Sequence, residues 1–322
     1  MDKAMKTATR SLHALPVERI AGLTPELFHQ RYLTGSGKPV IVTDAMDSWR
    51  AVSRWSFDFF KARYGNDHVS PRIFNGVRRV KLMKFNGFLD YLDSPDAESP
   101  GLWIDAKTLR PCPAPAEPGS TPLYLAWNVF RLHPELLDDI ELSPKFVEDL
   151  LPLLPHGLLN TLYNTSYFPG GLMIGGKGAQ VGLHYDFLRS HAYLAQVIGK
   201  KRCVLFSPED SGALYKGMVD PDAPDFEKFP LFRNAVPYEC TLEPGELLFM
   251  PSRWWHHAVA LEKSITVNYN FFNRVNFSGY LTHLLRDLPT IVNALEDLPA
   301  EVADLQIKWK SRGFDFPDRG PA

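Results

Sequence analysis

The stretch Gly182-Leu183-His184-Tyr185-Asp186 decides how the rest of the chain is interpreted. His184 and Asp186 are two residues apart, so on a β-strand their side chains leave the same face. A second stretch, Pro251-Ser-Arg-Trp-Trp-His256-His257, follows the apolar run 246–250. Two imidazoles and one carboxylate are the donor set that binds one face of a non-haem iron ion. Together the two stretches predict an iron site made by His184, Asp186 and one of the two later histidines.

The adjacent histidines cannot both be ligands. In a strand, His256 and His257 point to opposite faces, so only one of them can face inward. The alternation of side chains along a strand does not show which of the two histidines faces inward. The other is expected to support the first or to lie at the surface.

The bulk properties describe an ordinary globular chain. With 322 residues, 45% of them hydrophobic, it is long enough for one large domain with extensions. The net charge is −2, which gives no basic excess for nucleic acid or an acidic membrane. Three cysteines without close spacing indicate a reducing compartment. The N-terminus has no secretion-type apolar segment and no run has the length of a membrane span, so we expect a cytoplasmic protein with no membrane or nucleic-acid partner.

The pattern divides the chain into three parts: a flexible tail at 1–16, a catalytic domain at 17–276 with its core strands at about 120–275, and a helical segment at 277–322. Near the N-terminus, Thr24 and Ser56 are predicted to cap two helices, one stopping near Gly35 and the other closed by Gly65, with a buried strand at 39–43 between them. Two strands should flank the hairpin signal Asn75-Gly76, followed by a helix at 85–92.

Two further segments are predicted from composition and caps. Residues 94–122 are rich in Pro, Ala and Glu and are a candidate lid or mobile loop. A helix is expected to begin at Ser143-Pro144 and run towards Leu151.

Short strands separated by turn signals dominate the second half. An antiparallel sandwich or jelly roll is expected because no long helices intervene. The insert 207–237 is Asp- and Pro-rich and is expected to be loop-like. The predicted strands are 123–127, 171–175, 180–187, 192–198, 201–206, 238–242, 246–250, 256–261 and 264–271.

Three polar residues on these strands each have two interpretations. Lys201 follows a turn glycine, so it is either a solvated hairpin lysine or a buried cation for the distal carboxylate of a 2-oxoglutarate co-substrate. Tyr124 and Asn268 lie within apolar strands. They either complete that pocket or satisfy buried backbone groups.

Four motifs in this order resemble the cupin-like JmjC oxygenases. They are the stretch from Met173 through His184 and Asp186, Gln196-Val-Ile-Gly-Lys-Lys201, Pro244 through Trp-Trp-His256, and Ile265-Thr-Val-Asn268. Within that family the motifs resemble those of the asparaginyl hydroxylase called factor inhibiting HIF. The match covers roughly residues 120–275, with a weaker one at 20–92.

The resemblance implies a fold, a ligand set and a co-substrate site. The fold would be mainly β with flanking helices: a double-stranded β-helix (jelly roll) core with an N-terminal α/β elaboration and C-terminal helices. His184, Asp186 and His256, the histidine directly after the Trp pair, would bind Fe(II). Lys201, assisted by Tyr124 and with Asn268 nearby, would bind 2-oxoglutarate.

The sequence departs from the family pattern at two positions. Val181 stands where the nearest relative has a co-substrate-binding threonine, and Ala192 stands where relatives often have asparagine. Ser190 or His191 could rebuild the pocket.

The leading functional hypothesis is a dioxygenase that uses Fe(II), 2-oxoglutarate and O2 to hydroxylate a side chain of a protein or peptide. A small-molecule hydroxylase of the same family and a non-catalytic metal-binding cupin sensor are the alternatives. The helical segment carries an apolar stripe that includes Leu284, Leu285, Leu288 and Ile291. Because the nearest relative dimerises through C-terminal helices, the resemblance implies a homodimer formed by this stripe.

Overall fold

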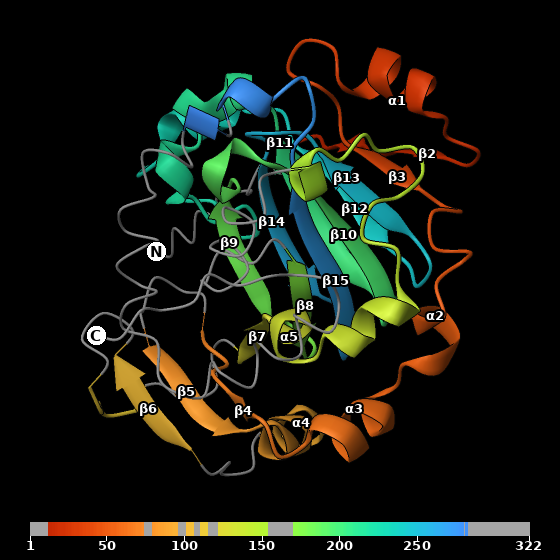
Figure 1. Ribbon diagram of the computed structural model, residues 1–322. Helices are drawn as coiled ribbons and strands as arrows, with labels where there is room; N and C mark the ends of the chain where they lie inside the picture. The colour runs from red at the N-terminus through yellow and green to blue at the C-terminus, as the bar shows by residue number, and fades with distance from the viewer. Residues whose placement is uncertain are drawn as a thin grey trace, which may run out of the picture.

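Two facing sheets form the core of the protein in the computed structural model, which describes residues 12–73, 79–95, 101–105, 110–114, 122–153, 170–279 and 281–282 (Figure 1). From β8 onward the chain passes repeatedly between them, and this gives two four-stranded halves with the order β13-β10-β15-β8 and β12-β11-β14-β9. The predicted jelly roll is therefore confirmed. The first half comprises β8 (Gly170–Gly175), β10 (His191–Ile198), β13 (Leu247–Met250) and β15 (Ser264–Phe271). The second comprises β9 (Gln180–His184), β11 (Lys201–Phe206), β12 (Tyr238–Leu242) and β14 (Trp255–Ala260).

Short N-terminal strands extend both sheets. β1 (Leu15–Pro16) pairs in parallel with β12, so these two residues are held in the sheet although they were predicted as part of a tail. β2 (Glu18–Ile20) and β3 (Val40–Val42) continue the other sheet beyond β13, and β7 (Tyr124–Trp127) closes it beyond β8.

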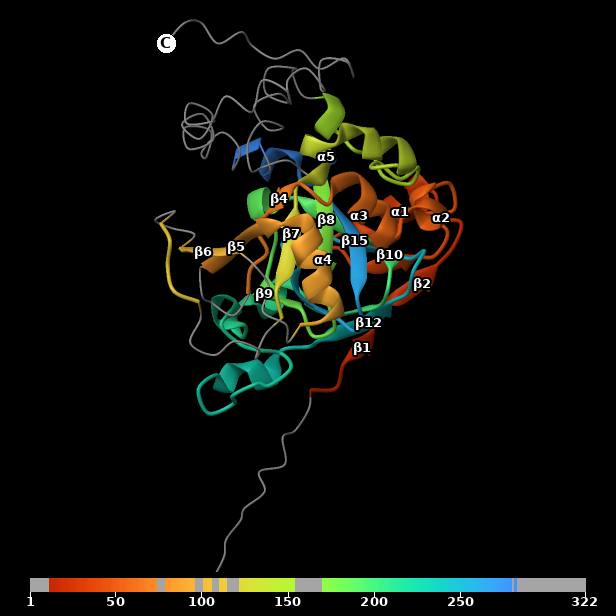
Figure 2. The same ribbon diagram turned by 90° about the horizontal axis from the view of Figure 1, so that it is seen from below.

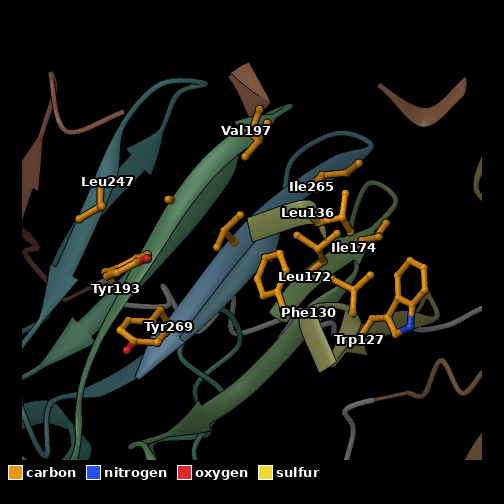
Figure 3. Close-up of a cluster of buried hydrophobic side chains, with 14 of the residues drawn as sticks. Trp127, Phe130, Leu136, Leu172, Ile174, Tyr193, Val197, Leu247, Ile265 and Tyr269 are labelled. Atoms are coloured by element: carbon orange, nitrogen blue, oxygen red, sulfur yellow. The ribbon is translucent and has the colours of Figure 1, made fainter. Parts of the chain in front are cut away.

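Alternation along the strands of the seven-stranded sheet separates an outer apolar face from an inner face. The outer face packs against helices α1 (Pro25–Tyr32), α2 (Ala51–Arg54), α3 (Phe57–Tyr64), α4 (Phe85–Asp93) and α5 (Val129–Leu132) (Figure 2). Figure 3 shows part of this cluster, with Tyr193, Leu247 and Tyr269 on neighbouring strands. The next residue along each strand points the other way, into the space between the sheets.

Capping residues set the helix boundaries where the sequence predicted them. The Thr24 hydroxyl accepts a hydrogen bond from the Leu27 amide (3.3 Å), and the Ser56 hydroxyl accepts one from the Phe59 amide (3.0 Å). Each satisfies a donor that the first helical turn leaves open.

A small third sheet lies beside the core and contains β4 (His68–Val69), β5 (Arg79–Lys84) and β6 (Leu102–Asp105). β4 and β5 pair antiparallel, as expected for strands on either side of a hairpin. The Asn75-Gly76 turn itself lies outside the described residues, as does much of 94–122, so the lid stays a prediction.

The helix predicted to begin at Ser143 is wrong. The Ser143 hydroxyl donates to the Asp149 carboxylate (2.7 Å) instead of capping a helix, and the Leu150 amide donates to the Phe272 carbonyl (2.9 Å). Tertiary partners therefore take the groups that a helix would use. Only a 3-10 helix forms at the end of the segment, over Leu151–Leu153.

The insert 207–237 is more regular than predicted. It contains 3-10 helices at Pro208–Gly212, Tyr215–Gly217 and Pro230–Asn234. Its Leu214, Phe229 and Phe232 pack on the outer face of the five-stranded sheet.

Among the described residues, no helix has the length and apolarity needed to cross a membrane. Apart from 277–279 and 281–282, the predicted C-terminal helical segment lies outside them.

Candidate metal centre

The structure brings together the three residues predicted to be ligands. Strands β9 and β14 lie side by side (Figure 1). His184 is the last residue of β9 and is paired with His256 at the start of β14, with ring centroids 4.2 Å apart. One donor atom from each histidine and one Asp186 carboxylate oxygen all lie within 4.8 Å of one another.

The position of Asp186 differs from the prediction. The strand was expected to continue to 187, but β9 ends at His184, and Asp186 lies in the loop beyond it. Its carboxylate nevertheless approaches Nε2 of His256 to 3.9 Å. Asp186 therefore reaches the two histidines from the loop after β9, and not from the same strand face as His184.

Backbone carbonyls orient both imidazoles. Nδ1 of His184 is 2.8 Å from the Gly182 carbonyl oxygen, and Nδ1 of His256 is 3.2 Å from that of Trp254. A carbonyl oxygen only accepts hydrogen bonds, so each Nδ1 carries the proton and each Nε2 keeps its lone pair for a metal. Burial, together with the nearby His184, lowers the pKa of His256 to about 4, so this ring is neutral at pH 7, as a ligand must be.

His257 lies on the opposite side of its strand. Its Nδ1 is 2.9 Å from the Val181 carbonyl and its Nε2 is 3.1 Å from the Asp222 carboxylate. Together with Asp220 and Asp222, His257 forms a second group of possible donor atoms, separate from His184 and Asp186. The geometry therefore favours His256, the choice that the resemblance implied.

Lys201 is buried, with 1% of its surface exposed, which excludes the solvated-hairpin interpretation. Its Nζ donates to the hydroxyls of Tyr124 (3.0 Å) and Thr266 (2.6 Å). Burial lowers the pKa of Lys201 to about 8, so the ammonium is still mostly charged at pH 7. No carboxylate in the described part of the chain pairs with it. A buried charge with only neutral partners is a strong binding site for an anion.

One cavity between the two sheets joins the anion site to the metal site. Its lining includes the three candidate ligands together with Lys201 and Tyr124. Asn268, Asn270, Met173, Val181 and Ala192 also line it. The residues present fit a divalent metal with an anionic chelator, because three neutral or anionic donors lie at one part of the cavity and an uncompensated cation at another.

Sequence reasoning missed Thr266 and Asn270. They alternate with Asn268 along β15, so all three share the inner face. The Thr266 hydroxyl donates to the Gln196 side-chain oxygen (2.7 Å) while accepting from Lys201. The sequence does contain a signal for them, because every second residue from 266 to 270 is polar. Only Asn268 was identified from this pattern.

One of the two departures from the family pattern, Ala192, lies beside a polar residue of the neighbouring strand. Ala192 is paired with Asn270 across the β10–β15 ladder, and both line the cavity. Asn270 donates to the Ser190 hydroxyl (3.0 Å), and Ser190 itself does not line the cavity. His191 does not line this cavity, because its ring lies against Phe249 and Phe271 on the other face of the sheet.

Comparison with known proteins agrees with this fold. The cupin-like domain family matches residues 25–277. The chain is 30% identical to human tRNA wybutosine-synthesizing protein 5 over 269 residues, which cover 79% of this chain and 77% of that protein. It is 28% identical to an arginine-specific demethylase of Arabidopsis thaliana over 305 residues, which cover 88% of this chain and 63% of the demethylase. A lysine-specific demethylase of the same plant is 28% identical over 281 residues, 26% of its length. The chain therefore spans less than two thirds of either demethylase.

Proposed function

The chain belongs to the cupin-like domain family, and from this we propose that it is an Fe(II)- and 2-oxoglutarate-dependent oxygenase that hydroxylates a group on a macromolecule. The observation that carries the proposal is the single cavity that joins the His184, Asp186 and His256 donors to the buried Lys201 ammonium. A metal site alone would not need the Lys201 ammonium. A dicarboxylate that chelates the metal would use both the metal and the ammonium.

Each residue has a defined task in this proposal. His184, Asp186 and His256 would hold the metal on one face and leave its other face open. Lys201, with the hydroxyls of Tyr124 and Thr266, would hold the distal carboxylate of 2-oxoglutarate. When bound, the iron and the co-substrate supply the oxygen-activating chemistry. The protein supplies orientation and a cavity whose apolar walls exclude water.

The test is succinate formation by the purified protein. We expect it to require both Fe(II) and 2-oxoglutarate and to be lost in His256→Ala. The matched control is His257→Ala, which removes the neighbouring imidazole but no ligand. If the protein binds iron and 2-oxoglutarate without forming succinate, it is the metal-binding sensor of the alternative hypothesis and not an oxygenase.

For the substrate, we propose a side chain of a protein or peptide, with a small-molecule substrate as the alternative. The particular resemblance to an asparaginyl hydroxylase has no specific support and stays a prediction. A nucleoside in RNA is a second candidate, because the names of several relatives concern tRNA. The expectation of no nucleic-acid partner therefore lacks support. Tyr185, next to the ligand His184 and 48% exposed, is a surface on which a base could stack.

Mass spectrometry separates these substrates. A peptide library and total RNA, each incubated with enzyme and co-substrates, are searched for a gain of one oxygen atom that requires Asp186. Modification confined to RNA would overturn the choice of protein. Modification of neither would leave the small-molecule alternative.

A further inference from the structure

A second cavity, of about 490 Å³, lies at the same end of the jelly roll as the metal centre. No residue lines both this cavity and the metal cavity. The two are nevertheless close, because His191 and Pro251 of this cavity are the sequence neighbours of Ala192 and Met250 of the metal cavity. Its charged lining residues are Arg189, Arg253 and Glu209. It is therefore a separate polar site beside the centre.

Arg253 occupies a backbone position that normally favours glycine. The turn Pro251–Trp254 is closed by a hydrogen bond from the Trp254 amide to the Pro251 carbonyl (3.2 Å), and Arg253 has φ +69° as its third residue. A positive φ at this position of a turn is typical of glycine. Placing an arginine at position 253 instead of a glycine therefore costs backbone conformational energy.

Arg189 is in the same situation on the facing loop. Its φ is +53°, directly after Leu188 at +60°. The strained segment is held from outside, because the Arg189 carbonyl accepts from the Ser252 hydroxyl (2.7 Å) and from the Asn276 side-chain amide (2.9 Å). Left-handed non-glycine residues that are fixed by their surroundings cluster at ligand sites.

Arg189 and Arg253 are both exposed. Neither makes an ion pair or a hydrogen bond with another residue in the part of the chain that the structure describes. Arg189 comes three residues after Asp186 and Arg253 three residues before His256, so each Cα lies within about 11 Å of a candidate ligand's Cα. Two guanidinium groups without a partner among the described residues therefore lie on loops that lead directly to the candidate ligands.

We propose that this cavity binds a phosphate group carried by the substrate, which positions the substrate for oxidation at the neighbouring centre. A carboxylate has two oxygens and is satisfied by one guanidinium fork, whereas a phosphate has enough acceptor oxygens for two forks. Ser252 and Ser278 add hydroxyl groups to the same lining. With Glu209, the three charged side chains have a net charge of +1. This low charge limits the affinity for phosphate, so binding should require both arginines. The inference rests on the proposed oxygenase function for its role, but not for the binding itself.

The binding test uses inorganic phosphate, followed by ³¹P NMR, with 2-oxoglutarate present to occupy the Lys201 site. Arg253→Gly removes the guanidinium and relieves the positive φ, so it should fold without loss of thermal stability while weakening phosphate binding at least fivefold. Arg253→Lys keeps the charge but not the fork and should fall between the two. Arg63→Gln, an exposed arginine on α3, is the matched control and should bind phosphate as the wild type does.

The outcomes separate this inference from the oxygenase proposal. Equal phosphate affinity in wild type and Arg253→Gly, or no binding at all, overturns the inference. Stronger arginine-dependent binding of malonate than of phosphate overturns the choice of phosphate. Succinate formation by the wild type, measured separately without any phosphate, decides the oxygenase function. Either proposal can therefore fail while the other stands.

Discussion

Replacing Lys201 by methionine should make the ligand-free protein more stable and abolish its response to 2-oxoglutarate. Burial lowers the pKa of Lys201 from 10.5 to about 8. Since one pKa unit is worth about 1.4 kcal/mol, keeping the ammonium charged at pH 7 costs the folded state about 3 kcal/mol. Methionine removes that cost but also two hydrogen bonds, to Tyr124 and Thr266, worth about 1 kcal/mol each. The net expectation is a stabilisation of about 1 kcal/mol, or about 2 °C in Tm.

The dependence on pH gives the sign of the effect. Lys201 is a base whose pKa is lower in the folded than in the unfolded chain, so the unfolded chain binds more protons between about pH 8 and 10.5. The stability of the wild type relative to Lys201→Met should therefore be lowest below pH 8 and should rise through this window. Thermal denaturation of both metal-free proteins at pH 7 and pH 9.5 measures the difference.

The ligand arm of the experiment uses the same melting curves. With metal and 2-oxoglutarate at about 100 times its Kd, the wild type should gain about 2.7 kcal/mol, and Lys201→Met should gain little at the same concentration. Lys200→Met is the matched control, because Lys200 is exposed and pairs with Glu243 at the surface; it should change stability by less than about 0.5 kcal/mol. A destabilised Lys201→Met at pH 7, or one that keeps the full 2-oxoglutarate response, would refute the reasoning.

Three further predictions concern the candidate ligands, one ion pair at the sheet surface and the expected dimer. Asp186→Ala should remain folded but lose iron, as measured by metal analysis, whereas His257→Ala should retain it; the reverse result would show that the ligand choice is wrong. Asp222→Asn should lower stability by under about 1 kcal/mol at pH 7. Because the hydrogen bond with His257 lowers the pKa of Asp222 to about 2, this difference should disappear as the pH falls from about 4 to 2 in denaturation curves; a difference that persists at pH 2 contradicts it. The chain should be a homodimer that Leu284→Arg/Leu288→Arg dissociates; light scattering showing an intact protein that is monomeric at micromolar concentration rules this out.

The fold was predictable from the sequence because its elements are encoded locally. Short apolar or alternating runs bounded by turn signals mark the core strands, and hydroxyl caps mark the helices that begin after Thr24 and Ser56. Local signals failed where a distant group outcompeted them. Ser143 is a good helix cap by sequence, yet its hydroxyl is used by Asp149, which also accepts from the Tyr269 hydroxyl. No pattern within ten residues of Ser143 contains Tyr269.

The cluster of His184, Asp186 and His256 forms in a different way from the one that the sequence indicated. The spacing of His184 and Asp186 implied a shared strand face, but the ladder ends at the pair His184 and His256. Alternation gives the face of a residue only while pairing lasts, and it carries no information about where pairing stops. The three predicted residues do come together, but only His184 and His256 do so as a pair on neighbouring strands.

The anion site shows most clearly what only the folded chain reveals. A polar residue at every second position of a strand indicates either a solvated face or a buried polar stripe, and the two have the same pattern. The pairing of Thr266 with Gln196 places the stripe inside, where the Thr266 hydroxyl can reach Lys201 on the opposite sheet. Lys201 is 65 residues from Thr266 in sequence and 77 from Tyr124. Both partners are neutral, so they leave the charge of the Lys201 ammonium uncompensated. The preference for an anionic ligand therefore arises only where the two sheets meet, and it cannot be seen in the sequence of any one strand.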